Sequence, residues 1–95
     1  MKLTVENEVF EAGEIKTPNV SILVVSGTKG MLACGYINCA AGDKFGDAVA
    51  IVRGVKTYDD MLKAVVQEVN QTAAKLGAAT GMTGLQVLKL FGGMK

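Results

Sequence analysis

The sequence predicts an α+β fold built on a mixed, largely antiparallel sheet of about five strands, with a short crossover helix and two C-terminal helices. Two observations predict it. Runs of β-branched residues separated by turn residues fill the first half of the chain, and apolar residues at three- and four-residue spacing fill the second. Because the chain has 95 residues and no internal repeat or linker, we expect a single domain, 1–95.

Four strands in two hairpins are expected first. A polar turn at Glu6-Asn7 separates the first pair, and Pro18, which lacks an amide N–H, breaks the pattern after it. Gly30 can adopt a positive φ and close the second hairpin. The four predicted strands are Leu3–Val5, Val9–Ile15, Val20–Ser26 and Met31–Asn38.

A short helix and a further strand are expected next. Asn38 is a suitable N-cap for a helix over Cys39–Phe45, and Gly46 favours the left-handed conformation that commonly ends a helix. Ala48–Arg53 is predicted to be a strand that is apolar on both faces, which is typical of a position in the middle of a sheet.

The longer of the two C-terminal helices is predicted to begin at Thr57 and to end at Gly77. The Thr57 hydroxyl can accept from the backbone N–H of Asp60, whose carboxylate can reach back toward the Thr57 amide. At ~1.5 Å per residue the helix would be about 30 Å long. One apolar stripe runs along it: Tyr58, Met61, Leu62, Val65, Val66, Val69, Ala73 and Leu76.

The last helix is predicted over Leu85–Phe91. Thr83 and Gln86 have the spacing of a capping box, in which each side chain bonds the backbone N–H of the other residue. Apolar residues nearly surround this helix, so we expect it to be buried or to form an interface.

Composition excludes several classes of partner. Ten basic and nine acidic side chains give a formal charge of +1, so no global field attracts nucleic acid or an anionic membrane. The apolar runs are far shorter than the ~20 residues that span a bilayer, and the first residues lack the pattern of a secretory signal. We therefore expect a cytoplasmic protein without a nucleic-acid or membrane partner. Because hydrophobic residues make up 49% of so short a chain, we also expect a homo-oligomer.

The chain has no histidine, and this restricts its chemistry. Histidine is the commonest general base and the usual partner of a serine or cysteine nucleophile. The two cysteines, Cys34 and Cys39, are expected to be reduced, and two thiolates without further ligands make a poor zinc site. We therefore assign no metal-binding residue, and the sequence identifies no cofactor.

Four short blocks carry a family resemblance. They are Cys-Gly-Tyr-Ile-Asn at 34–38, Gly-Asp-Ala-Val-Ala at 46–50, Val-Arg-Gly-Val-Lys-Thr at 52–57 and Gly-Met-Thr-Gly at 81–84. In order and spacing they resemble the YunC-like family of small prokaryotic proteins, over nearly the whole chain. That family is one of unknown function, so the resemblance implies a compact α+β domain in a prokaryotic cytosol and supplies no catalytic residues. Its Cys-Gly-Tyr pattern falls on Cys34, whereas Cys39 lies outside it.

Cys34 is the centre of the first candidate site. Tyr36 and Asn38 follow it at two-residue steps in a predicted strand, so a thiol, a phenol and an amide would share one face of the sheet. Asp47, at the entrance to the next strand, is a candidate general base. The alternatives are a small buried residue at Cys34 and a turn aspartate at Asp47. Cys39 is the alternative thiol, because the start of its predicted helix favours an anion.

Arg53, Lys56 and Thr57 form the second candidate site. Two cations and a glycine stand between the end of a strand and the start of a helix, where proteins commonly hold anions and phosphates. Neither the P-loop nor the dinucleotide-binding glycine fingerprint is present. The alternative is a solvated loop followed by a helix cap.

Three functions agree with these patterns. The leading hypothesis is a homo-oligomeric small-molecule-binding or regulatory protein, with an anionic ligand near Arg53 and Lys56. The second is a cysteine-dependent enzyme in which Cys34 is the nucleophile and Tyr36 or Asp47 handles protons. The third is an interaction module that uses its apolar last helix. The sequence does not decide whether the protein is an enzyme.

Overall fold

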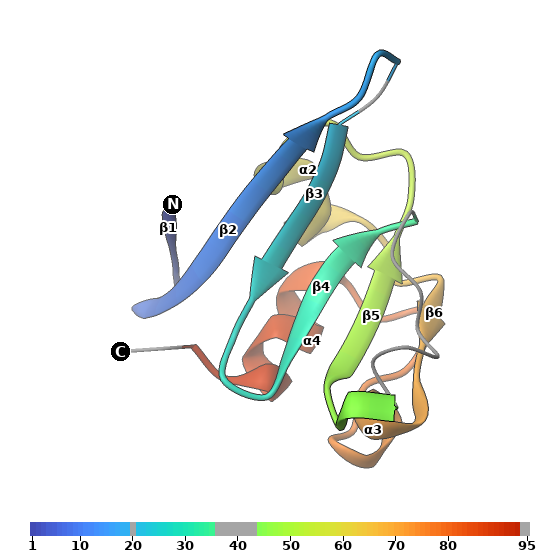
Figure 1. Cartoon of the computed structure of the whole chain (residues 1–95). Helices are drawn as coiled ribbons and strands as arrows, with labels where there is room; N and C mark the ends of the chain where they lie inside the picture. Colours follow the sequence, from blue (N-terminus) through green and yellow to red (C-terminus); the bar gives the residue numbers. More distant parts are fainter. Residues whose placement is uncertain (20, 36–43, 94–95) are drawn as a thin grey trace.

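The computed structural model describes residues 1–19, 21–35 and 44–93, and it contains a six-stranded sheet with three helices on one side (Figure 1). The strands lie in the order β1-β2-β3-β4-β5-β6. Their bounds are β1 Lys2–Val5, β2 Glu8–Lys16, β3 Ser21–Ser26, β4 Gly30–Cys34, β5 Ala48–Val52 and β6 Glu68–Val69. The helices are α2 Tyr58–Lys63, α3 Gln71–Lys75 and α4 Gly84–Phe91.

The predicted fold class is confirmed, with one strand more than expected. Strands β1 to β4 form an antiparallel meander, β5 is parallel to β4, and β6 is antiparallel to β5. The sheet is therefore mixed and largely antiparallel. None of the helices in the described part of the chain is long and apolar enough to cross a membrane.

The first hairpin follows from its turn residues. Glu6 and Asn7 have φ values of 49° and 70°, and two consecutive positive φ values give the turn twist that matches a two-residue hairpin. Val5 consequently pairs with Glu8, and the register places Phe10 and Ala12 in the core. The predicted polar turn at Glu6-Asn7 is thus confirmed.

Strand β5 is the centre of the fold. All five of its residues are buried, as the apolar pattern predicted. It pairs in parallel with β4 from Gly30↔Ala48 to Cys34↔Val52, so both strands end at the same edge of the sheet. The crossover helix between them is described only at Lys44 and Phe45, which are helical, and Gly46 follows with a φ of 78°. The rest of that predicted helix, Cys39 included, lies outside the described residues.

Strand β4 is shorter than predicted. It ends at Cys34, and Gly35 is in a turn, whereas the sequence predicted a strand that continues to Asn38. Tyr36 and Asn38 lie outside the described residues. Of the strand face expected for Cys34, Tyr36 and Asn38, the structure therefore describes Cys34 alone.

The prediction of one helix from Thr57 to Gly77 is wrong. The chain forms α2, then an extended stretch with strand β6, then α3. Ala64 leaves the helix with a ψ of 150°, and Gln67 and Asn70 donate backbone N–H groups to the carbonyls of Ile51 and Val49 in β5. Without this stretch the backbone groups of β5 on that side would be buried and unpaired, which costs more than the local preference for helix gains.

The predicted caps at the helix starts are largely confirmed. The Thr57 hydroxyl accepts from the Asp60 amide at 3.1 Å, but the Asp60 carboxylate accepts from the amide of Lys56 rather than that of Thr57. Thr83 and Gln86 form the complete capping box at the start of α4. Helix α4 buries Val87, Leu88 and Phe91 among the other core side chains, so the nearly all-apolar helix is part of the core.

Candidate functional site

The strands separate at one edge of the sheet, and the separation opens a cavity. Strands β2 and β3 remain paired as far as Lys16↔Ser21, but the pairing of β3 with β4 stops at Val24↔Ala33. Strands β4 and β5 then end together at Cys34 and Val52. The cavity lies between the β2–β3 hairpin, the end of β4 and the loop from β5 to α2, and we call it the splayed-strand cavity.

The splayed-strand cavity has a volume of about 780 Å³, within the range of about 300–1,000 Å³ common for small-molecule sites. Its described lining carries three basic side chains and no acidic one. The described lining residues are Lys16, Thr17, Asn19, Ser21, Cys34, Gly35, Arg53, Gly54, Val55 and Lys56. The lining therefore combines positive charge with polar and small apolar groups.

Arg53 is held at the mouth of this cavity by two features. Its Nη2 donates to Glu68 Oε2 at 2.5 Å, which fixes one side of the guanidinium. Gly35 leaves room for the Arg53 side chain, because a Cβ built at Gly35 would lie 3.2 Å from Arg53 Nε. The remaining N–H groups of the guanidinium stay available for a carboxylate or phosphate.

The other two cations of the lining, Lys16 and Lys56, have no fixed partner among the described residues. Lys16 from β2 and Lys56 from the β5–α2 loop form no ion pair with another described residue. Both side chains are long and amphipathic, so their ammonium groups can move to meet a ligand. The cavity thus holds a fixed planar cation and two adaptable point charges.

Cys34 adds a thiol to the cations that line this cavity. As the last residue of β4 it is only 6% exposed, and it lines the cavity. No described residue donates a hydrogen bond to its thiol or accepts one from it. The two candidate sites predicted from the sequence therefore converge at Cys34, Arg53 and Lys56.

Thr57 and Tyr58 lie next to this cavity and outside its described lining. The Thr57 hydroxyl is engaged by the Asp60 amide, and the Lys56 amide donates to Asp60, so the first turn of α2 is capped from within the chain. Burial, with a contribution from the charge of Glu14, raises the pKa of the Tyr58 phenol.

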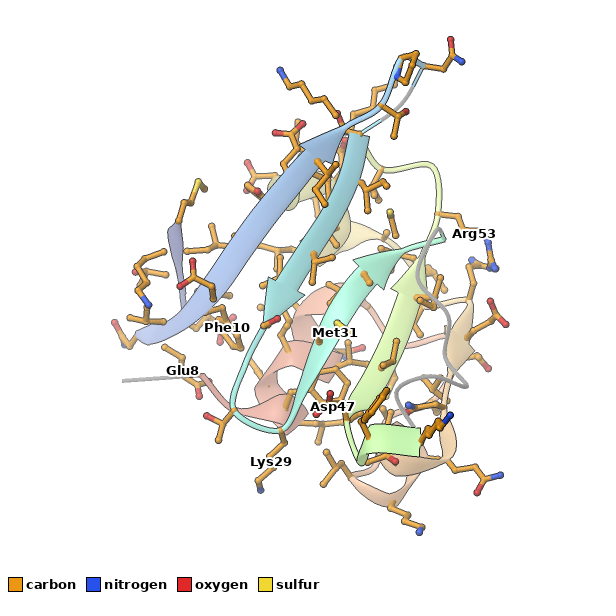
Figure 2. The ribbon with its side chains drawn as sticks, viewed as in Figure 1. Glu8, Phe10, Lys29, Met31, Asp47 and Arg53 are labelled. Carbon is orange, nitrogen blue, oxygen red and sulfur yellow. The ribbon has the colours of Figure 1, made fainter. Side chains whose placement is uncertain are left out.

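Asp47 lies at the other end of the sheet (Figure 2). It precedes β5, and the six residue steps from Asp47 to Arg53, at ~3.3 Å each, separate the two residues by roughly 20 Å. Its backbone carbonyl accepts from the buried side chain of Asn70 at 2.8 Å. The structure brings Cys34 together with Arg53 and Lys56, and it does not bring Asp47 to them.

Comparison with known proteins identifies the family. The family model for a domain of unknown function, DUF1805, matches residues 33–91. The chain belongs to this family. It is 29% identical to the uncharacterised protein YunC of Bacillus subtilis over 90 residues, which is 90% of this chain and 89% of YunC. The predicted YunC-like resemblance is therefore confirmed.

A solved structure shares the fold of this DUF1805 protein. The crystal structure of TA1206 from Thermoplasma acidophilum, a protein of unknown function, superposes with a TM-score of 0.89 at 35% sequence identity. The match covers 97% of this chain and 90% of the other. The DUF1805 segment includes Cys34, Arg53 and Lys56, whereas Lys16 precedes it.

Sequence reasoning missed the part of the site that comes from the β2–β3 hairpin. Lys16, Thr17, Asn19 and Ser21 line the cavity from thirteen or more positions before Cys34, the next lining residue along the chain. The sequence does show a lysine next to the Thr-Pro-Asn turn, which could have marked this part of the site. Which other strand ends near that lysine depends on the order of the strands in the sheet. Among the described residues no group of three or more cysteine or acidic side chains could hold a metal ion.

Proposed function

We propose that this DUF1805 protein binds a small anionic molecule in the splayed-strand cavity. One observation carries the proposal: three cations, one from the end of β2 and two from the β5–α2 loop, line one cavity whose described lining has no carboxylate. Cations so arranged repel one another in the empty cavity, and an anion relieves that repulsion. The cavity also lies at the carboxyl ends of the parallel strands β4 and β5, the edge where sheets of this kind commonly bind ligands.

Arg53 is the residue that should provide most of the recognition. Its pairing with Glu68 pre-orients the guanidinium, which lowers the entropy lost when a carboxylate or phosphate binds in bidentate fashion. Lys16 and Lys56 then supply charge without strict geometry. A phosphorylated or carboxylated metabolite fits this combination.

Anion binding predicts stabilisation that depends on Arg53. In a thermal-shift panel of inorganic phosphate, citrate and phosphorylated metabolites, a ligand present at 100 times its dissociation constant should stabilise the protein by about 2.7 kcal/mol. Arg53→Gln and Lys56→Gln should each weaken binding at least about tenfold, because one charge-assisted contact is worth about 1.5–3 kcal/mol. Calorimetric titration of the best ligand checks the loss.

Lys89→Gln is the matched control for Arg53→Gln. Lys89 is 52% exposed and pairs with Glu6, while Arg53 is 51% exposed and pairs with Glu68, but Lys89 is not a lining residue. Lys89→Gln should leave ligand affinity unchanged. Equal affinities of wild type, Arg53→Gln and Lys89→Gln would contradict the proposal.

We also propose that the working unit is a homo-oligomer. The helices cover one side of the sheet, and the strand alternation puts Ile15, Ile22 and Val24 on the opposite side. Ile15 is 66% exposed, and Gly13, two residues before it on the same face of β2, has no atom within 4 Å of an added Cβ, so this face is open beside an exposed apolar side chain. Such a surface suits a second copy of the chain.

Native mass spectrometry should therefore find a dimer or larger assembly at micromolar concentration. Ile15→Lys should shift the assembly to monomer, since it places a charge in the apolar contact. Val65→Lys changes another exposed apolar residue away from this surface and should not. A wild-type protein that stays monomeric at ~100 μM, a concentration at which even a weak specific dimer forms, would refute this part of the proposal.

Two other functions have less support. The cysteine enzyme lacks one of its two proposed proton-handling residues near Cys34, because Asp47 lies at the far end of β5. The other, Tyr36, lies outside the described residues. The interaction module requires an exposed apolar last helix, whereas α4 directs Val87, Leu88 and Phe91 into the core and exposes Gln86 and Lys89.

A further inference from the structure

We infer that Cys34 is a site of reversible S-thiolation, at which a low-molecular-weight disulfide bearing carboxylate or phosphate groups forms a mixed disulfide inside the splayed-strand cavity. The inference rests on the proposed anion site and deepens it. It gives the buried thiol a reaction partner and makes the cavity sensitive to oxidised anionic thiols.

The position of Cys34 is the first argument. Its side chain is more than nine-tenths buried, lines a cavity of about 780 Å³, and has no hydrogen-bond partner among the described residues. A cysteine used only to fill the core has its sulfur surrounded by apolar side chains, whereas this one faces a volume large enough for an organic ligand. Cys34 also belongs to neither of the two hydrophobic clusters that form the described core.

Charge at the mouth of the cavity is the second argument. Arg53 and Lys56 follow β5, whose last residue, Val52, is the register partner of Cys34, and Arg53 lies over Gly35. A reagent that enters the cavity to reach the sulfur therefore lies beside these cations. Charged clefts of this kind raise the local concentration of oppositely charged molecules by 10-fold or more. An anionic disulfide should consequently react faster than a neutral one of the same intrinsic reactivity.

The chemistry needs no oxidant beyond the disulfide itself. The deprotonated sulfur of Cys34 attacks one sulfur of the disulfide, the S–S bond of the reagent breaks, and a new S–S bond to Cys34 forms. The other half of the reagent leaves as a thiolate, and the Cys34 proton goes to solvent. A small thiol reverses the exchange. No histidine or internal base is required, which agrees with a chain that has none.

Thiolation of Cys34 and binding of a free anion should exclude each other. The half of the reagent that stays on Cys34 occupies the volume in which Arg53 and Lys56 would hold a free anion. Thiolated protein should therefore lose the thermal stabilisation by phosphate or citrate, and a thiol reductant should restore it. Binding of the free anion should likewise slow thiolation.

The test measures the charge selectivity of one thiol. In a Cys39→Ser background, the folded protein is treated with a dianionic aromatic disulfide, 5,5′-dithiobis(2-nitrobenzoate), and with a neutral one, 4,4′-dithiodipyridine. Each rate is divided by the rate of the same reagent with the urea-unfolded chain. We expect the normalised rate of the anionic reagent to exceed that of the neutral reagent at least about fivefold, within the range of electrostatic focusing.

Variants assign this selectivity to the cavity. Arg53→Gln and Lys56→Gln should each remove most of the preference, measured as the ratio of the two normalised rates. Lys89→Gln should keep this ratio, because it removes a cation elsewhere. Intact-mass analysis with Cys34→Ser shows which thiol is modified. An unmodified Cys34 in folded protein, or modification without charge preference, overturns the inference. If anions still stabilise the protein in either case, the proposed binding function stands and only the thiol chemistry fails.

Discussion

Replacing Gly84 with alanine is expected to destabilise the protein by about 2 kcal/mol or more, although alanine is the better helix former. In an unconstrained helix this change would gain about 1 kcal/mol. Here a Cβ at Gly84 would run into the backbone carbonyl oxygen of Met61 and would lie 2.8 Å from a methyl group of Leu32. Overpacking of this kind costs about 1–3 kcal/mol and more against a rigid backbone, so the clash exceeds the gain in propensity.

The rigidity of the contact makes the effect large. The end of α2 and the start of α4 are also joined by a bond from the Gly84 amide to the Ala64 carbonyl, 3.0 Å long, so the two helices cannot separate without losing it. For a domain of this size a loss of 2 kcal/mol lowers Tm by roughly 10 °C. Thermal unfolding followed by circular dichroism measures the shift.

Gly13→Ala is the control for Gly84→Ala. A Cβ at Gly13 meets no atom within 4 Å, and Gly13 has no positive φ. This substitution should change the free energy of unfolding by no more than about 1 kcal/mol, and in the stabilising direction, through the unfolded state. If Gly84→Ala were as stable as Gly13→Ala, the close approach of α4 to Met61 would be wrong.

Replacing Asn70 with alanine is the second change with a large expected effect, about 2–4 kcal/mol. Asn70 is the one buried polar residue in the described part of the chain. Its Oδ1 accepts from the amides of Val49 and Ala73 at 3.0 and 2.9 Å, and its Nδ2 donates to the carbonyl of Asp47. Alanine would leave the buried Val49 amide without this acceptor and remove the cap of α3.

Thr83→Ala is the control that separates the two contributions of Asn70, the cap of α3 and the bond to the Val49 amide, because it removes a helix cap alone. Thr83 is half-buried, and the one bond that its hydroxyl accepts from a described residue comes from the Gln86 amide, so its removal should cost about 1 kcal/mol. Asn70→Ala should cost clearly more in urea unfolding, and hydrogen exchange at the Val49 amide should accelerate. An Asn70→Ala variant no less stable than Thr83→Ala would show that the bond to β5 contributes little.

Only part of the candidate site in the splayed-strand cavity could be predicted from the sequence. Arg53, Lys56 and Cys34 were identified from chemistry that local spacing displays: a cation pair between a strand and a helix, and a thiol in a strand. That these three residues share one cavity depends on the parallel register Cys34↔Val52, which no local pattern encodes. Lys16 depends further on β3 leaving β4 at Val24, a property of how the sheet twists and pairs.

The sequence alone determined the elements whose signals are local. These are the Glu6-Asn7 turn, the wholly buried β5 and the capping box at Thr83, because turn conformation, burial on both faces and cap chemistry involve neighbouring residues. The tertiary structure decided what happens between Ala64 and Asn70. The apolar stripe at helical spacing favours one continuous helix over this segment. The backbone groups at the open edge of β5, however, need hydrogen-bond partners, and part of the segment forms β6 and provides them.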